Sequence, residues 1–412
     1  MSTTVVSEKE KFIWNTLGSL SNAFASLILT ICVNRIMGAD SGGIFALAYS
    51  NAQLMLTISA FEVRNYQATD VSEKYSFSQY FTFRLLTCAI TIPVILFYIM
   101  TNDFSSSEAI VVFTLSIYKV IEAFTDVYGG RFQQKDRIDL SGKLFFVRVA
   151  ASMLMFIVLL AITKNLVIAS VGMMITSFAL FFVYDYRYVF DMDRGFHLST
   201  KSMWHMIRDT FPLFVGTFIM MYISNAPKYA INDLHSNTMQ NIYNILFMPA
   251  FVINLFSSFV FRPLLVKMAI YWQDRNFKSL VKIILMMNGG IIGFTLVVLV
   301  GAWLLGIPVL SFLYAIDLDG YQAQLLMVMF VGGLSALMSF ANNVLVVMRK
   351  QNVLIPISAI SFLFALIAVP KIVEMYAITG AIVSYGVSIG LIVLLYNIAI
   401  IVSLEKEKKG NE

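Results

Sequence analysis

Apolar stretches of about 20 residues recur along almost the whole chain, separated by short polar connections. A helix of this length is long enough to cross the hydrocarbon core of a bilayer, so each stretch predicts one span. An even number of spans would place both termini on the same side of the membrane. We predict twelve spans, at residues 12–34, 42–61, 80–100, 108–129, 141–162, 165–186, 211–233, 241–261, 282–306, 322–347, 353–374 and 377–402.

The composition agrees with a protein whose main solvent is lipid. Of the 412 residues, 59% are hydrophobic and only 13% are charged, whereas a soluble domain has about 25% charged residues. The connections leave no room for a water-soluble catalytic domain. We therefore predict an all-α, polytopic membrane protein, with a six-helix bundle at 1–190, a cytoplasmic linker with an interfacial helix at 191–210, and a second six-helix bundle at 211–412.

The basic residues predict the orientation. With the N-terminus inside, the external segments hold only Arg35, Lys164 and Lys371. Four basic residues lie within spans, and the other 22 of the 29 lie in cytoplasmic segments. Because cytoplasmic loops carry an excess of Lys and Arg, this bias predicts a multi-pass cell-membrane protein with both termini in the cytoplasm.

The two halves of the chain show a weak internal similarity. Phe45 precedes Arg64 by 19 residues at the second span, and Tyr243 precedes Arg262 by 19 residues at the eighth. Six spans followed by six in the same orientation is the parallel repeat of many transporters. Chance similarity between helix ends is the alternative.

Charged residues inside spans are costly in lipid and therefore mark candidate functional positions. Lys228 follows Asn225 and Pro227 in the seventh span, where the proline is expected to free backbone carbonyls. Arg84 and Arg148 lie one and two turns inside their spans. All three cations could instead extend to the membrane interface.

Two further groups of charged residues have both a structural and a functional interpretation. Arg64 and Arg262 end the second and eighth spans, either to fix orientation or to bind phosphate through bidentate hydrogen bonds. Lys119, Glu122 and Asp126 lie on one face of the fourth span. Lys119 and Glu122 could neutralise each other, or Glu122 or Asp126 could bind a coupling H⁺ or Na⁺.

No enzyme motif is present in the sequence. The three histidines lack metal-ligand spacing, and there is no nucleotide-binding lysine motif and no GxSxG. The glycine pairs at 129–130, 289–290 and 332–333 are interpreted as positions of close helix packing or of helix bending. We therefore expect no catalytic activity, no metal and no cofactor. Two amphipathic segments, Leu198–Asp209 and Val266–Leu280, are predicted to lie in the membrane interface.

Three segments in the seventh and eighth spans resemble a known family. These are Asn225–Ile231, Ile245–Asn254 and Phe259–Leu264. They are similar to Wzx-type polysaccharide repeat-unit flippases of the multidrug/oligosaccharidyl-lipid/polysaccharide (MOP) exporter superfamily, in their Gram-positive form. The resemblance implies a V of two six-helix bundles, like that of multidrug and toxic compound extrusion (MATE) transporters, around a cation-rich cavity.

The resemblance also implies a substrate and a set of contacts. The substrate would be an undecaprenyl-pyrophosphate-linked oligosaccharide, moved from the cytoplasmic to the outer leaflet by alternating access for capsule or other surface polysaccharide. Membrane lipid, a coupling H⁺ or Na⁺, and polysaccharide polymerase or assembly proteins would be its partners, and nucleic acid would not. The contacts carried over from the family are Arg35, Arg64, Lys228, Arg262, Asn15, Asn22 and Asn225. Arg84 and Arg148, which are candidates because they lie inside spans, complete the set of pyrophosphate and glycan contacts.

Other functions stay open at this point. A multidrug or cation extruder of the same superfamily would need buried carboxylates, and only Glu122 and Asp126 qualify. A flippase for lipid-linked peptidoglycan precursors would need the same cations. A membrane polysaccharide polymerase or glycosyltransferase should show a large external loop or an acidic catalytic cluster, and the sequence has neither.

Overall fold

The computed structural model describes residues 6–70, 74–185, 188, 200–261 and 264–409. Every regular element among these residues is a helix, as the sequence predicted. The chain divides into two compact units, Met1–Phe218 and Ile219–Glu412. The boundary falls inside the long helix α9 (Thr200–Leu234). The bundle limits at 190 and 211 stay a prediction.

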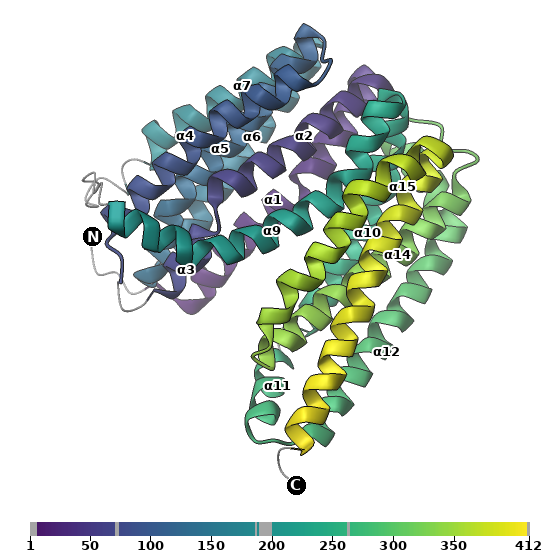
Figure 1. Cartoon of the computed structure of the whole chain (residues 1–412). Coiled ribbons are helices and arrows are strands. Elements are labelled where there is room, and N and C mark those ends of the chain that lie inside the picture. Colours follow the sequence, from purple (N-terminus) through teal and green to yellow (C-terminus); the bar gives the residue numbers. More distant parts are fainter. Residues whose placement is uncertain (1–5, 71–73, 186–187, 189–199, 262–263, 410–412) are drawn as a thin grey trace. The chain divides into compact units, whose positions relative to one another are not determined.

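Long helices make up the first unit (Figure 1). α1 packs along α6, and α2 packs along α5, which also contacts α4 and α7. Short elements follow two of these helices: α3 (Val63–Thr69) comes after α2, and the π-helical turn η1 (Phe181–Asp185) ends α7. The long helices are α1 (Glu8–Met37), α2 (Ala39–Ala60), α4 (Phe77–Thr101), α5 (Ser106–Gln134), α6 (Ile138–Thr163) and α7 (Leu166–Leu180).

Glycines bring several helices into close contact. A Cβ atom added to Gly142 of α6 would lie 2.4 Å from the carbonyl oxygen of Trp14 in α1, so the two backbones pack directly. At the predicted packing pair Gly129–Gly130, an added Cβ would meet Arg64 or Gln67 of α3. Close packing is observed for this pair and for 332–333. At 289–290 nothing lies within 4 Å of an added Cβ, so helix bending stays the prediction there.

The second unit is built around α14 (Gln322–Val347), which contacts α10, α12 and α15 (Figure 1). α10 (Asn237–Phe261) and α11 (Leu264–Gln273) come first. α12 (Phe277–Gly301) continues through the π-helical turn η2 (Ala302–Gly306) into α13 (Ile307–Tyr314). After the short η3 (Gln351–Val353), α15 (Leu354–Lys409) is interrupted at Ala377, with φ 46° and ψ −127°.

Among the described residues, eight helical segments are long and apolar enough to cross a membrane. One of them, Gln351–Glu407, has 57 residues and contains the break at Ala377, so it is longer than a single crossing requires. α2, α5 and α10 have 22, 29 and 25 residues, which is also spanning length. The helices agree with the predicted spans to within a few residues at most ends. The count of twelve spans stays a prediction.

Two local expectations differ from the structure. The segment predicted as a separate interfacial helix, Leu198–Asp209, forms the first turns of α9 from Thr200 onward. α9 runs on through Pro227 to Leu234, and a proline at this position removes one hydrogen bond of the helix. The second predicted interfacial segment, Val266–Leu280, is split between α11 and the start of α12.

The junction between α2 and α3 is locally strained. Phe61 and Glu62 both have left-handed backbone angles, with φ of 45° and 54°. Such a conformation costs a residue with a side chain about 1–2 kcal/mol. The surrounding packing compensates for this strain: Phe61 stacks on Phe214 of α9, with ring centroids 4.3 Å apart and planes 13° apart. The position of α3 is therefore set by tertiary contacts.

Candidate functional site

Within the first unit, charged side chains from four elements surround a small cavity. Its volume of about 30 Å³ leaves room for about one water molecule. The elements that meet here are α3, α5, α6 and η1. The lining residues are Arg64, Thr125, Asp126, Tyr128, Gly129, Phe132, Ser141, Leu144, Phe145, Arg148 and Asp185.

Arg64 and Asp126 form the outer ion pair of this cavity. The Nη1 group of Arg64 donates to Oδ1 of Asp126, and its Nη2 group donates to Oγ of Ser141 at 3.2 Å. The side chains of Arg64 and Asp126 are 32% and 26% exposed, so a solute can reach them. The guanidinium lies over Gly129, where an added Cβ would come within 3.1 Å of Nη1. Gly129 therefore leaves the space that Arg64 occupies.

Arg148 and Asp185 form the inner ion pair. Nη1 of Arg148 donates to Oδ2 of Asp185, and both side chains are about 95% buried. The guanidinium also lies 5.9 Å from the ring of Phe145. Oδ1 of Asp185 is buried and has no hydrogen-bond partner among the described residues. Since a buried oxygen without a donor is costly, this atom is a ready acceptor for a group that enters the cavity.

Sequence analysis overlooked Asp185. The only signal was an acidic residue at the end of the apolar stretch 165–186, where it could have been a loop residue. The π-helical turn η1 instead places Asp185 in a buried position within the first unit. Such turns often occur at functional positions because they re-aim a side chain.

A third ion pair lies on the face of α5 that carries Asp126, apart from the cavity. Nζ of the fully buried Lys119 donates to Oε2 of Glu122 at 2.7 Å and to Oδ1 of Asn22 at 3.2 Å. It also lies 5.4 Å from the rings of Tyr49 and Tyr118. The sequence left mutual neutralisation and ion coupling open, and the structure shows that Lys119 and Glu122 pair with each other. Asp126, on the same face, pairs with Arg64.

Arg84 is fully buried but does not line the cavity. Its Nη1 group donates to the carbonyl of Ser59 at 2.8 Å, and the hydroxyl of Thr87 donates to the same oxygen. Ser59 belongs to the last turn of α2, where carbonyls lack partners within the helix. A cation at this end of a helix is favourable. Arg84, from α4, therefore caps the C-terminal end of α2 and fixes the position from which α3 starts.

The remaining predicted contacts lie elsewhere. Asn15 and Arg35 are exposed on α1 and do not line the cavity. In the second unit, Asn225 is buried and its amide donates to the carbonyl of Met221, while Lys228 is half-buried. Arg262 lies outside the described residues. Of the nine predicted substrate contacts, the structure thus brings Arg64 and Arg148 together in one site.

The two units differ in the polar groups that they bury. In the second unit, the described buried polar side chains are amides and hydroxyls, such as Asn225, Gln240 and Ser335, and none is charged. All described buried charges belong to the first unit. They are Lys11, Asp70, Arg84, Lys119, Glu122, Asp139, Arg148 and Asp185.

A sequence model of one protein family matches most of the chain. It is described as polysaccharide biosynthesis protein, and it matches residues 9–269. The chain belongs to this family. No curated protein matches the chain.

Solved structures show the same fold at low sequence identity. An inward-facing multidrug-resistance MATE transporter of the MOP superfamily has a TM-score of 0.61 at 12% identity, covering 98% of this chain and 97% of its own. The Vibrio cholerae MATE transporter VcmN in its bent form has a TM-score of 0.57 at 12% identity, with 97% of each chain covered. A MOP-superfamily transporter from Pyrococcus furiosus, described as having a binding pocket of reversed polarity, gives 0.53 at 13% identity, with 96% and 95% covered.

Family and fold together define the class of this protein. It is an integral membrane protein with the MATE-like fold of MOP transporters, and its family acts in polysaccharide biosynthesis. The solved structures that share this fold are MATE and MOP-superfamily transporters.

Proposed function

We propose that this protein moves undecaprenyl-pyrophosphate-linked oligosaccharide repeat units from the cytoplasmic to the outer leaflet of the cell membrane by alternating access. The observation that carries the proposal is the pair of arginines beside one cavity, Arg64 at its accessible side and Arg148 at its buried side. A guanidinium holds phosphate oxygens through two parallel hydrogen bonds, which a lysine cannot reproduce.

Exchange of ion-pair partners would provide the binding step. In the described state each arginine is neutralised by a carboxylate, Arg64 by Asp126 and Arg148 by Asp185. The cavity has no room for a diphosphate, so binding requires the site to open. A diphosphate that takes over the guanidinium groups releases the two carboxylates. These then carry charge that a coupling H⁺ or Na⁺ can neutralise, which links ion movement to substrate binding.

The polar groups of the second unit fit the other part of this substrate. A neutral glycan offers hydroxyls that donate and accept hydrogen bonds, and amides and hydroxyls are suitable partners for them. Gln240 and Tyr243 of α10 are fully buried, and their side-chain polar atoms have no hydrogen-bond partner among the described residues. We therefore propose Gln240 and Tyr243 as contacts for the sugars of the substrate.

The same contacts disfavour a multidrug or cation extruder. A cationic drug requires a carboxylate that is free to bind it. Glu122, Asp126 and Asp185 each pair with a cation of the protein itself. A flippase for peptidoglycan precursors would present the same diphosphate, and competition between the two lipids in the assay below separates these substrates.

Flipping of a short-chain lipid-pyrophosphate oligosaccharide in proteoliposomes tests the proposal. Arg64→Ala and Arg148→Ala should each lower the rate about tenfold or more, because a hydrogen bond to a charged group contributes about 1.5–3 kcal/mol and 1.4 kcal/mol is tenfold. Arg64→Lys should not restore the rate. Arg137→Ala is the matched control, since Arg137 pairs with Asp139 and does not line the cavity. Unchanged flipping in both cavity variants would refute the proposal.

A further inference from the structure

The short helix α3 has functional contacts on two sides. One side faces the cavity, where Arg64 binds Asp126 and Ser141. Gly129 and Gly130 of α5 leave the space for Arg64 and for Gln67, which is fully buried against them. A displacement of the Arg64 guanidinium therefore acts directly on a helix of only seven residues.

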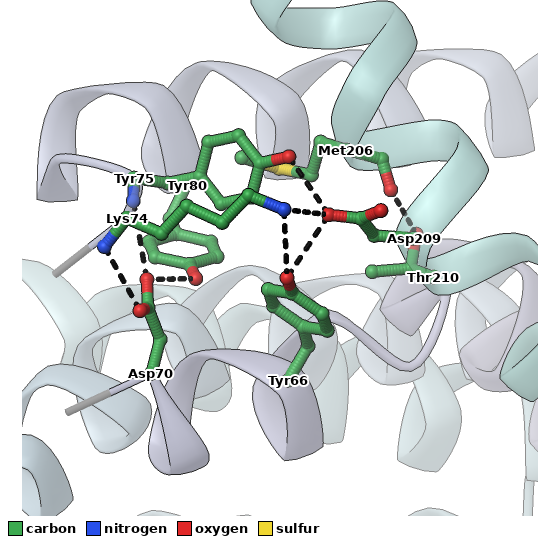
Figure 2. Close-up of polar contacts among 8 residues, drawn as sticks. All are labelled: Tyr66, Asp70, Lys74, Tyr75, Tyr80, Met206, Asp209 and Thr210. Atoms are coloured by element: carbon green, nitrogen blue, oxygen red, sulfur yellow. Dashed lines mark hydrogen bonds and ion pairs between the residues drawn. The ribbon is translucent and has the colours of Figure 1, made fainter. Parts of the chain in front are cut away.

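The other side of α3 is bonded to α9. The hydroxyl of Tyr66 donates to Oδ2 of Asp209 at 2.9 Å (Figure 2). The same carboxylate oxygen accepts from the hydroxyl of Tyr75 at 2.9 Å and from Nζ of Lys74 at 2.6 Å. Lys74 and Tyr75 lie between α3 and α4, so Tyr66 is the member of this network that α3 itself carries.

The strained junction before α3 completes the connection. Phe61, at the end of α2, stacks on Phe214 of α9, one helix turn beyond Asp209 and within the same unit. α3 is thus held to α9 by a ring stack at its start and by a hydrogen bond from its middle. α9 is also the helix in which the boundary between the two units falls.

We propose that α3 couples the two sides: an anion that draws Arg64 from Asp126 displaces α3, and Tyr66 passes the displacement through Asp209 to α9. This inference rests on the proposed function, because it takes a pyrophosphate group as the anion at Arg64. Asp209 and Tyr66 are positioning residues in this scheme, since neither lines the cavity.

Tyr66→Phe tests the coupling with a single lost hydroxyl. Tyr75→Phe is the matched control, because it removes a hydroxyl from the same carboxylate oxygen but from outside α3. Nitroxide labels on cysteines at Gln133 of α5 and Trp204 of α9, both exposed, report the position of α9 within the first unit. The full-length protein would carry Cys32→Ala and Cys88→Ala, and inorganic pyrophosphate is the ligand.

In the parent protein and in Tyr75→Phe, we expect pyrophosphate to change the label distance by about 1–2 Å, the size of helix shifts in known switches. In Tyr66→Phe, pyrophosphate should bind with near-parental affinity and the change should be lost. Asp209→Leu provides a second variant with the same expectation, because leucine offers Tyr66 no acceptor. An unaltered change in Tyr66→Phe, or bound pyrophosphate without any change in the parent, would overturn the coupling. A parent that does not bind pyrophosphate would instead contradict the proposed function.

Discussion

Gly142→Ala tests the packing on which the first unit depends. The new Cβ would lie 2.4 Å from the carbonyl oxygen of Trp14 and 2.6 Å from the backbone nitrogen of Asn15. Ordinary contact begins at 3.4 Å, and backbone atoms cannot rotate away, so α1 and α6 must separate by about 1 Å. Overpacking of this kind costs about 1–3 kcal/mol, whereas alanine gains about 0.5–1 kcal/mol over glycine within a helix.

The net effect is a loss of up to about 2.5 kcal/mol, which lowers the Tm by up to about 10 °C. Thermal unfolding of the purified protein in detergent measures it. Gly290→Ala in α12 is the matched control, because nothing lies within 4 Å of its added Cβ. The control should leave the Tm unchanged or raise it. A Tm for Gly142→Ala equal to or above that of the control would refute the close α1–α6 contact.

Three further predictions concern the charged groups. Arg148→Met should lower stability by about 3–5 kcal/mol, because it leaves Asp185 buried without its partner. Adding Asp185→Asn should restore the Tm but not transport. Equal Tm values for the single and the double variant would argue against the ion pair. Gly129→Ala should keep a near-parental Tm but slow flipping, since its Cβ displaces only the ends of Arg64 and Ser141; parental flipping would count against the placement of Arg64. The hydrogen bond to Asp209 raises the pKa of Lys74, so the stability that this contact contributes is complete below the ordinary lysine pKa of about 10.4 and is lost only above it. The Tm difference between parent and Lys74→Met should therefore stay constant between about pH 6 and 9, and a decline over this range would contradict the assignment.

Much of the fold follows from apolar length alone. The predicted spans at 80–100 and 108–129 correspond to α4 (Phe77–Thr101) and α5 (Ser106–Gln134), which begin at the capping residues Ser76 and Ser105. The sequence placed these ends inward by a few residues, because helices extend past the apolar stretch into polar turns. The segment 198–209 was predicted as a separate interfacial helix because Lys201, His205 and Arg208 interrupt its apolar residues, whereas in the structure it continues into the span as the first turns of α9.

The site was only partly predictable. Spacing on one helix predicted that Lys119 and Glu122 could pair, since residues three apart are neighbours. Spacing could not show that Asp126 binds Arg64 from α3, or that Arg148 binds Asp185 from η1, because these pairs depend on how helices pack. Nor could residue spacing distinguish Arg84, which caps the C-terminal end of α2, from the arginines that line the cavity.

The most direct test of the central claim is deletion of the gene, with polysaccharide at the cell surface and lipid-linked repeat units on the cytoplasmic leaflet both measured. The deletion should abolish the polysaccharide and cause intact repeat units to accumulate inside, and the parental gene, but not Arg64→Ala, should restore export. Normal polysaccharide in a strain that becomes drug-sensitive would contradict the account and identify the protein as a multidrug extruder.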